Sequence, residues 1–181
     1  MIETSPNPVL YQIGKGIMEI AEWVGGVPGA YTDVGNCPLF SVTVTEEKIP
    51  HFNQRTNVRL KDRNITIESG YTAEFDLDEI SVLNLKMFLR ATVASGHILH
   101  ANQALDKEYA IRFTSDNAAG RNERWNLWKA TLSPRGPFNL ISDEWSMLEF
   151  AVEGLADLVN HVASPYFDVT FVTTTSTTTT S

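Results

Sequence analysis

Few side chains in this sequence have the types and spacing that catalysis or metal binding requires. His97 and His100 form an HxxH pair that could supply two zinc ligands, but a zinc site needs three or four, and no CxxC or HExxH motif accompanies them. Asp76, Asp78 and Glu79 could act as paired general acids, and they equally fit a polar strand face followed by a helix start, where the macrodipole favours negative charge. We therefore predict no catalytic residue, no metal site and no cofactor, and we do not expect an enzyme.

Cysteine and tryptophan give two further candidates. Cys37 precedes a proline at the start of an expected strand, which favours a small, half-buried residue over a nucleophile, and as the single cysteine it excludes an intrachain disulfide. Trp125 and Trp128 could form a platform on which a sugar or a base stacks. Three residues apart on a strand, they point to opposite faces, so at least one should be core. A monomeric β-sandwich that binds carbohydrate or decorates a virion is the alternative function.

The composition sets the class of protein. The 181 residues, 43% of them apolar, predict one domain with a substantial core. The formal net charge of −8 argues against a basic surface that holds nucleic acid, although such a protein could still let DNA pass. The sequence shows no signal-peptide pattern and no apolar run approaching the roughly 18 residues of a membrane span, so we expect a soluble protein made in the cytoplasm, without a membrane partner.

The elements that must position these residues are mainly strands. Between residues 65 and 77 apolar and polar residues alternate, and from 80 to 89 the period changes to that of a helix, with Ser81 placed to cap its first turn. Further strands are predicted at 17–23, 38–47, 107–115, 123–132, 137–143, 146–155 and 166–172. This pattern predicts a mainly β fold, a β-sandwich or barrel subunit with one flanking α-helix.

Three segments fall outside this pattern. Residues 1–13 form a polar, proline-bearing N-terminal arm, and residues 173–181 form a Thr/Ser-rich C-terminal tail that cannot bury a core. Residues 46–64 carry many charges without a sustained period, and we interpret them as a long charged loop between two strands. A connection of that length usually has a function of its own.

Several stretches resemble the tail tube (major tail) proteins of long-tailed bacteriophages. They are 29–40 (GAYTDVGNCPLF), the strand 68–77, the junction 77–85 (LDEISVLNL), 112–121 (RFTSDNAAGR), 140–150 (LISDEWSMLEF) and 155–157 (LAD). Their order along the chain carries the resemblance, which covers residues 14–172. It implies a tail tube domain over those residues, with sixfold rings whose inner strands form a shared β-barrel around a DNA-wide lumen. Type VI secretion tube proteins share that fold.

Period-2 geometry and this resemblance together predict which residues face the lumen. The polar sides of three strands, whose other sides carry Phe40, Val42, Val44, Phe75, Phe150 and Val152, should line it. The predicted lumen-lining residues are Thr43, Thr45, Glu68, Thr72, Glu74, Asp76, Glu149 and Glu153. Carboxylates there would repel DNA phosphates and let the genome slide through into the host without specific binding.

The charged loop 46–64 is predicted to leave its own ring and dock on the next one. The predicted ring–ring contact residues are Glu46, Glu47, Lys48, Arg55, Arg59, Lys61, Asp62 and Arg63. Their basic excess would complement an acidic neighbouring ring and set the stacking register. The expected partners are further copies of the chain and other tail proteins, namely a baseplate, a tail terminator, a tape measure and in some tails a sheath. The expected location is the virion tail, assembled in the host cytoplasm.

Overall fold

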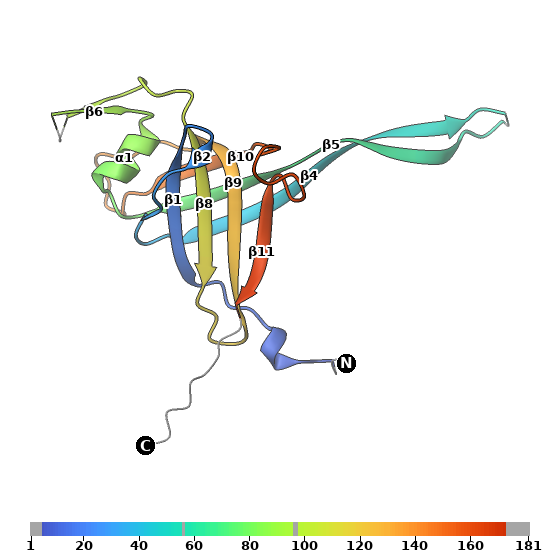
Figure 1. Cartoon of the computed structure of the whole chain (residues 1–181), viewed down its shortest axis with the longest axis horizontal. Helices are drawn as coiled ribbons and strands as arrows, with labels where there is room; N and C mark the ends of the chain where they lie inside the picture. The colour runs from blue at the N-terminus through green and yellow to red at the C-terminus, as the bar shows by residue number, and fades with distance from the viewer. Residues whose placement is uncertain (1–4, 56, 96–97, 173–181) are drawn as a thin grey trace, which may run out of the picture.

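The computed structural model describes residues 5–55, 57–95 and 98–172, and over these residues the protein is mainly β with one α-helix (Figure 1). The elements in chain order are η1 (Pro8–Leu10), β1 (Gly16–Val24), β2 (Val27–Pro28), β3 (Thr32–Asp33), β4 (Leu39–Asn53), β5 (Leu60–Leu77), α1 (Val82–Phe88), β6 (Thr92–Ala94), β7 (Ile98–His100), β8 (Glu108–Ser115), β9 (Asn122–Pro134), β10 (Leu148–Gly154) and β11 (Phe167–Val172). The described residues include no helix with the length and apolar character needed to cross a membrane. The predicted fold class is confirmed at this level.

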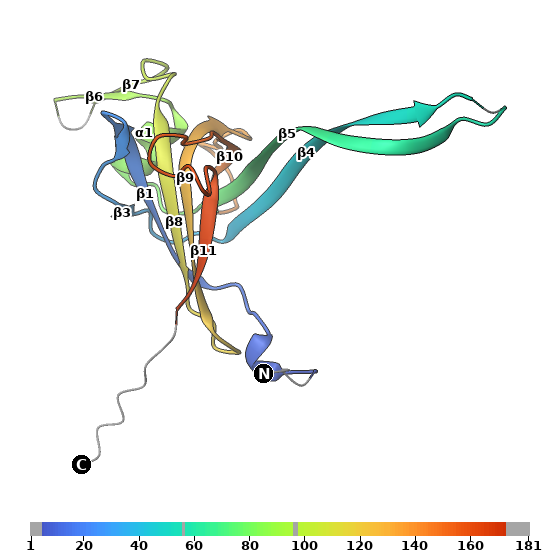
Figure 2. The ribbon, with the colours of Figure 1, turned by 45° about the vertical axis from the view of Figure 1, so that its right-hand side comes forward.

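One antiparallel sheet carries the fold, and β9 is the strand that divides it. The strand order is β2-β1-β8-β9-β10-β5-β4. On the edge away from β8, the first half of β9 pairs with β11, from Asn122 to Leu127, and the second half pairs with β10, from Ala130 to Pro134. The sheet therefore splits into two parts, β1-β8-β9-β11 and β9-β10-β5-β4, whose strands cross one another in both views (Figures 1 and 2).

The core lies between these two parts. On β5 the alternation predicted from the sequence is confirmed, because Tyr71, Ala73, Phe75 and Leu77 are buried while Thr72 and Glu74 are exposed. Phe75 stacks on Phe150 with ring centroids 4.5 Å apart. Each buried aromatic ring removes a large apolar area from water and so stabilises the core.

The helix α1 closes one end of this core. Its predicted cap is confirmed, since the Ser81 side chain accepts a hydrogen bond from Asn84 N at 3.1 Å. Phe88 packs edge-on against Phe150, and the buried Asn84 amide donates to the carbonyls of Val34 and Glu79. The helix is therefore fixed to the loop before β4 as well as to β10.

The prediction of a loop over residues 46–64 is wrong. Strands β4 and β5 remain paired as far as Asn53 and Leu60, and only residues 54–59 connect them. The result is a long two-stranded hairpin that leaves the body of the protein (Figures 1 and 2). Its register shifts at Glu47/Lys48 and again at His51/Phe52. Each β-bulge interrupts the period of two, which is why the sequence shows no strand pattern there.

Four of the strands predicted in the second half of the chain are confirmed, and one is wrong. The strands expected at 107–115, 123–132, 146–155 and 166–172 are present as β8 to β11, but 137–143 is not a strand and belongs to a loop that joins β9 to β10. The connection 91–106 contains the short hairpin β6–β7. Residues 1–4, 173–181 and His97 lie outside the described residues, so the role of the tail and the expectation that the HxxH pair binds no metal are not tested. The division of the chain at residues 13 and 173 also stays a prediction.

Candidate assembly surfaces

A polar surface covers the side of β4, β5, β10 and the end of β9 that faces away from the core. Cross-strand pairing arranges its residues in rows, for example Thr43, Thr72, Glu153 and Thr131. We call this surface the outer face; its members are Leu39, Ser41, Thr43, Thr72, Glu74, Asp76, Glu149, Ala151, Glu153, Thr131 and Ser133. The alternation that buries Phe75 and Phe150 inside thus presents carboxylates and hydroxyls outside.

Six of the eight residues predicted to line a lumen lie together on the outer face. They are Thr43, Thr72, Glu74, Asp76, Glu149 and Glu153. Thr45 continues the face by one row, opposite Gly70. Glu68 lies further out, opposite Glu47 and next to the first bulge. The structure brings the predicted residues onto one surface, and whether that surface lines a lumen stays a prediction.

The sequence analysis missed Arg135, which organises the carboxylates of this face. Its Nη1 lies 2.8 Å from Glu74 Oε2, and its Nη2 lies 2.7 Å from Asp76 Oδ1 and 3.7 Å from Glu149 Oε2. The hydrogen bond with Asp76, with the charges of the three carboxylates, raises the pKa of Arg135 above its ordinary value. A signal was available, because Arg135 is the one lysine or arginine in the sequence after Lys129.

The apolar side of β4 and β5 is buried over only part of its length. Val44, expected in the core with Phe40 and Val42, is 68% exposed, and Ile65 and Ile67 are also exposed. The physical reason is that β4 and β5 pass beyond the opposite part of the sheet near Val44, so that nothing in the described chain covers them. We call residues 46–67 the arm. The arm exposes several large apolar side chains: Ile49, Val58, Leu60, Ile65 and Ile67.

All eight residues predicted to contact another ring lie on the arm. Glu46, Glu47 and Lys48 are on β4; Lys61, Asp62 and Arg63 are on β5; Arg55 and Arg59 are in the connection between them. Glu46 forms an ion pair with Lys48, and Asp62 Oδ1 lies 2.6 Å from His51 Nδ1. Arg59 lies over the Phe52 ring. Within the described part of the chain, the side chains of Arg55, Lys61 and Arg63 have no ion-pair partner, so the arm presents free positive charge.

The residues considered for chemistry are occupied in other ways. Asp76 is paired with Arg135, and Asp78 Oδ2 accepts a hydrogen bond from Asn36 Nδ2 at 2.6 Å. The described residues contain no group of three or more potential metal ligands. Burial raises the pKa of the Cys37 thiol to about 11, so it is protonated at neutral pH, and it donates to Leu39 O at 3.1 Å. This thiol is not activated as a nucleophile.

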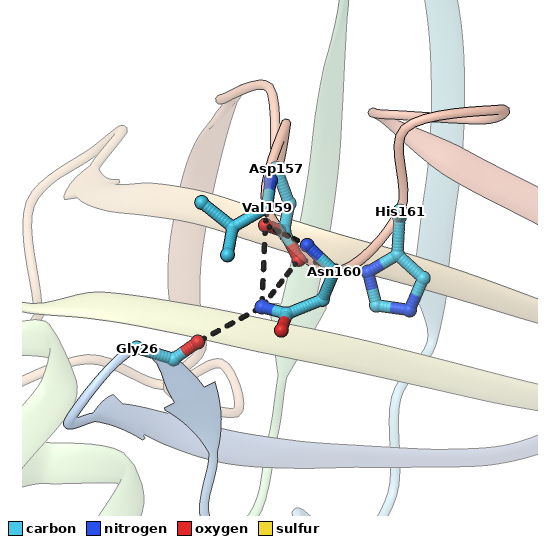
Figure 3. A network of polar contacts seen from close by, with 5 residues as sticks. All are labelled: Gly26, Asp157, Val159, Asn160 and His161. Atoms are coloured by element: carbon cyan, nitrogen blue, oxygen red, sulfur yellow. Dashed lines mark hydrogen bonds and ion pairs between the residues drawn. The ribbon is translucent and has the colours of Figure 1, made fainter.

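A histidine–carboxylate pair that the sequence analysis did not predict lies in the loop after β10 (Figure 3). Asp157, only 4% exposed, accepts hydrogen bonds from the backbone N–H groups of Val159 and Asn160 and lies 2.8 Å from His161 Nδ1. Asn160 Nδ2 also donates to Gly26 O at 2.9 Å. This network ties the loop to the turn between β1 and β2. It has the geometry of a catalytic pair, but Ser164 Oγ, three residues beyond the histidine, donates to Phe167 O instead.

Trp125 and Trp128 do not form a common platform. Trp128 stacks on the His161 ring at 3.6 Å, whereas Trp125 stacks on Phe167 at 6.0 Å. Trp125 also lines a cavity of about 300 Å³ between the two parts of the sheet, together with Phe40, Phe113, Gln12 and residues 14–16. Each indole therefore has one ring face covered by its own chain.

Comparison with known proteins gives a family and a distant structural likeness. The model of the family described as "Protein of unknown function UCP028589" matches residues 11–104. No curated protein matches the chain. Among solved structures, the chain is similar to one from the "Cryo-EM Structure of an Extracellular Contractile Injection System, PVC sheath-tube complex in extended state", with 13% sequence identity, 95% of this chain and 100% of that chain covered, and a TM-score of 0.39.

Proposed function

The chain belongs to the family described as "Protein of unknown function UCP028589", and from its surfaces we propose that it is the structural subunit of a phage tail tube. In this proposal, sixfold rings of the subunit stack into a hollow conduit through which the genome is ejected. The observation that carries the proposal is the outer face, a continuous polar surface across four strands whose other side is the core.

The charge of the outer face suits a conduit for DNA. It carries four carboxylates, those of Glu74, Asp76, Glu149 and Glu153, and its edge carries one guanidinium, that of Arg135. Negative charge on the wall repels phosphates, which keeps DNA from adhering to it. The hydroxyls of Thr43, Thr72, Thr131 and Ser133 hydrogen-bond with water and add no positive charge. DNA would therefore pass without specific binding.

The edge of the sheet supports a shared barrel. β4 is the last strand of the sheet order, and in the described part of the chain no strand pairs with its outer edge. A free edge favours association with another chain, and closing strands into a barrel removes it. A ring of subunits in which β4 meets the neighbouring subunit would close the outer faces into one inner wall.

The arm supports stacking of the rings. A two-stranded hairpin is marginally stable by itself in water, yet this one extends beyond the body with exposed apolar residues and unpaired basic groups. Docking on a neighbouring ring would cover those side chains and bring the charges to an acidic surface. In this proposal the eight charged arm residues named above form the ring–ring contact, six of them on β4 and β5 and two in the connection between these strands.

The role is structural, and the proposal places the protein in the tail of the virion after assembly in the host cytoplasm. Its partners would be copies of itself, with a baseplate, a tail terminator, a tape measure and in contractile tails a sheath. The alternative of a carbohydrate-binding module has less support, because His161 and Phe167 already cover one ring face each of Trp128 and Trp125.

Electron microscopy of the purified protein tests the proposal. Rings with sixfold symmetry, alone or stacked in tubes, are the expected result, and a strictly monomeric species at high protein concentration would contradict it. The triple variant Arg55→Glu, Arg59→Glu, Arg63→Glu should fold and form rings without tubes at physiological salt. A control that reverses two exposed basic residues outside the arm, Lys15→Glu with Arg124→Glu, should leave tube length unchanged.

A further inference from the structure

A second exposed apolar surface lies in the loop between β9 and β10. Leu140 is 85%, Ile141 97% and Trp145 91% exposed. We call residues 138–147 the apolar loop. The loop has fixed internal contacts, because Ser146 Oγ donates to Asn139 O at 2.7 Å and Glu144 N donates to Ser142 Oγ at 3.0 Å. A surface that presents two aliphatic side chains and an indole to solvent is typical of an interaction site.

The apolar loop and the arm lie at opposite ends of β5. The last residue of β5, Leu77, pairs with Leu148, which directly follows the apolar loop, and Phe138 packs against Phe88 of α1. The first residue of β5, Leu60, lies near the tip of the arm, so the strand's 18 residues place it roughly 55 Å from the apolar loop. Figure 1 shows α1 and the tip of the arm at opposite ends of the molecule.

The two surfaces are complementary in charge and in side-chain type. Between residues 136 and 147 the chain carries Asp143 and Glu144 and no lysine or arginine. The arm carries five basic residues against three acidic ones. Trp145 offers an exposed aromatic ring to arginine side chains, and tryptophan and arginine are the residue types that most often dominate interface energetics.

We propose that the apolar loop is the seat on which the arm of a second copy docks, in the next ring of the tube. This inference rests on the proposed function and names the receiving surface, which that function leaves open. Two different surfaces at opposite ends of one molecule make a heterologous contact, and a heterologous contact that does not close on itself propagates as a filament. The direction of propagation would follow β5.

Removal of the seat's apolar side chains gives the first test. The variant Ile141→Ser, Trp145→Ser should form rings but raise the critical concentration for tubes by about tenfold or more, measured by sedimentation and electron microscopy. The control Leu158→Ser, Val159→Ser changes two exposed apolar residues in another loop and should behave as the wild type. Normal tubes from the seat variant would overturn the inference and assign the apolar loop to a different partner, while the arm reversal would still test the tube itself. Absence of rings from the wild type would instead overturn the proposed function.

Crosslinking gives a second test that does not depend on how the seat variant folds. In a Cys37→Ser background, Leu60→Cys and Ile141→Cys are introduced together, tubes are assembled, and a bis-maleimide is added. Denaturing gels should show a ladder of crosslinked products, including products with more subunits than one ring contains. Neither single-cysteine variant should give this ladder. A product limited to dimers, or no product from assembled tubes, would overturn the inference.

Discussion

The Arg135 Nη2 atom lies 2.7 Å from Asp76 Oδ1, and this contact joins the residue after β9 to the row of the outer face nearest the end of β5. Since Arg135 N also donates to Glu149 O, the same residue is fixed by its backbone and by its side chain. Strand pairing brings the carboxylates of Glu74, Asp76 and Glu149 close together, and the guanidinium of Arg135 lies among them and offsets their repulsion. The positive charge of Arg135 is therefore held among three carboxylates, and replacing this residue tests what that charge contributes.

Replacing Arg135 with methionine keeps most of the side-chain volume and removes the positive charge. We expect a lower melting temperature, because Glu74, Asp76 and Glu149 then repel one another, and we expect the deficit to shrink as salt screens that repulsion. Thermal unfolding at low and at high ionic strength measures both effects. Arg63→Met, on the arm, is the control and should shift the melting temperature little. A salt-independent deficit would contradict the electrostatic explanation.

Asp157 predicts a loss of stability in acid. Burial by itself would raise its pKa, but hydrogen bonds from Asn160, His161 and Val159 outweigh burial and lower the pKa of Asp157 from 3.8 to about 2. A carboxyl whose pKa is lower in the folded than in the unfolded state stabilises the fold above the unfolded value, and that stabilisation is lost as the pH falls from about 4 to about 2. The shift corresponds to about 2 kcal/mol.

The free energy of unfolding of the variant Asp157→Asn should accordingly be about 2 kcal/mol lower than that of the wild type at pH 7. It should also vary less between pH 4 and pH 2. Denaturant unfolding over that pH range measures both quantities. Asp143→Asn, an exposed carboxylate, is the matched control. Parallel pH profiles for wild type and Asp157→Asn would show that the network does not stabilise the ionised group.

Phe75 should dominate the stability of the core. It is fully buried and stacks on Phe150, so Phe75→Ala should lower the free energy of unfolding by about 3–5 kcal/mol. Leu158→Ala, at an exposed position, should change it by less than about 0.5 kcal/mol. Denaturant titration of the unassembled protein gives both values. A small effect of Phe75→Ala would show that the stack of Phe75 on Phe150 is not a main source of the stability of the core.

Reversing charge on the outer face should make tubes retain DNA. Wild-type tubes should bind short duplex DNA weakly, whereas tubes of Glu74→Lys, Glu153→Lys should retain it, with an affinity that falls as salt rises. Co-sedimentation with labelled DNA at several salt concentrations measures this. The control Asp106→Lys, Asp116→Lys places the same charges on exposed residues elsewhere. Equal retention by both variants would place the outer face away from the lumen.

The sequence predicted those elements in which a single hydrophobic period continues along the element and one face packs against the core. The strand that ends at Leu77 and the helix capped by Ser81 fall in this class, because each buries one regular face. The arm could not be predicted, since two bulges shift its alternation and its apolar residues face no part of the described chain. Six of the residues expected on one polar side do share it. Arg135 was missed: its isolation as a basic residue was a signal, but its partners Glu74 and Asp76 lie 61 and 59 positions away in the sequence, beyond the reach of any local pattern.

The side chain of Asn117 holds the N-terminal segment against the turn between β8 and β9. Its Nδ2 donates to Tyr11 O at 2.9 Å, and its Oδ1 accepts from Ile13 N at 3.1 Å. Val172 pairs with Asn122 at the same turn, so the chain enters and leaves the described fold at one place. The outer face begins near Thr131, roughly 30 Å further along β9. A reporter domain or an affinity tag inserted at this turn would thus lie away from the outer face and leave its carboxylates uncovered.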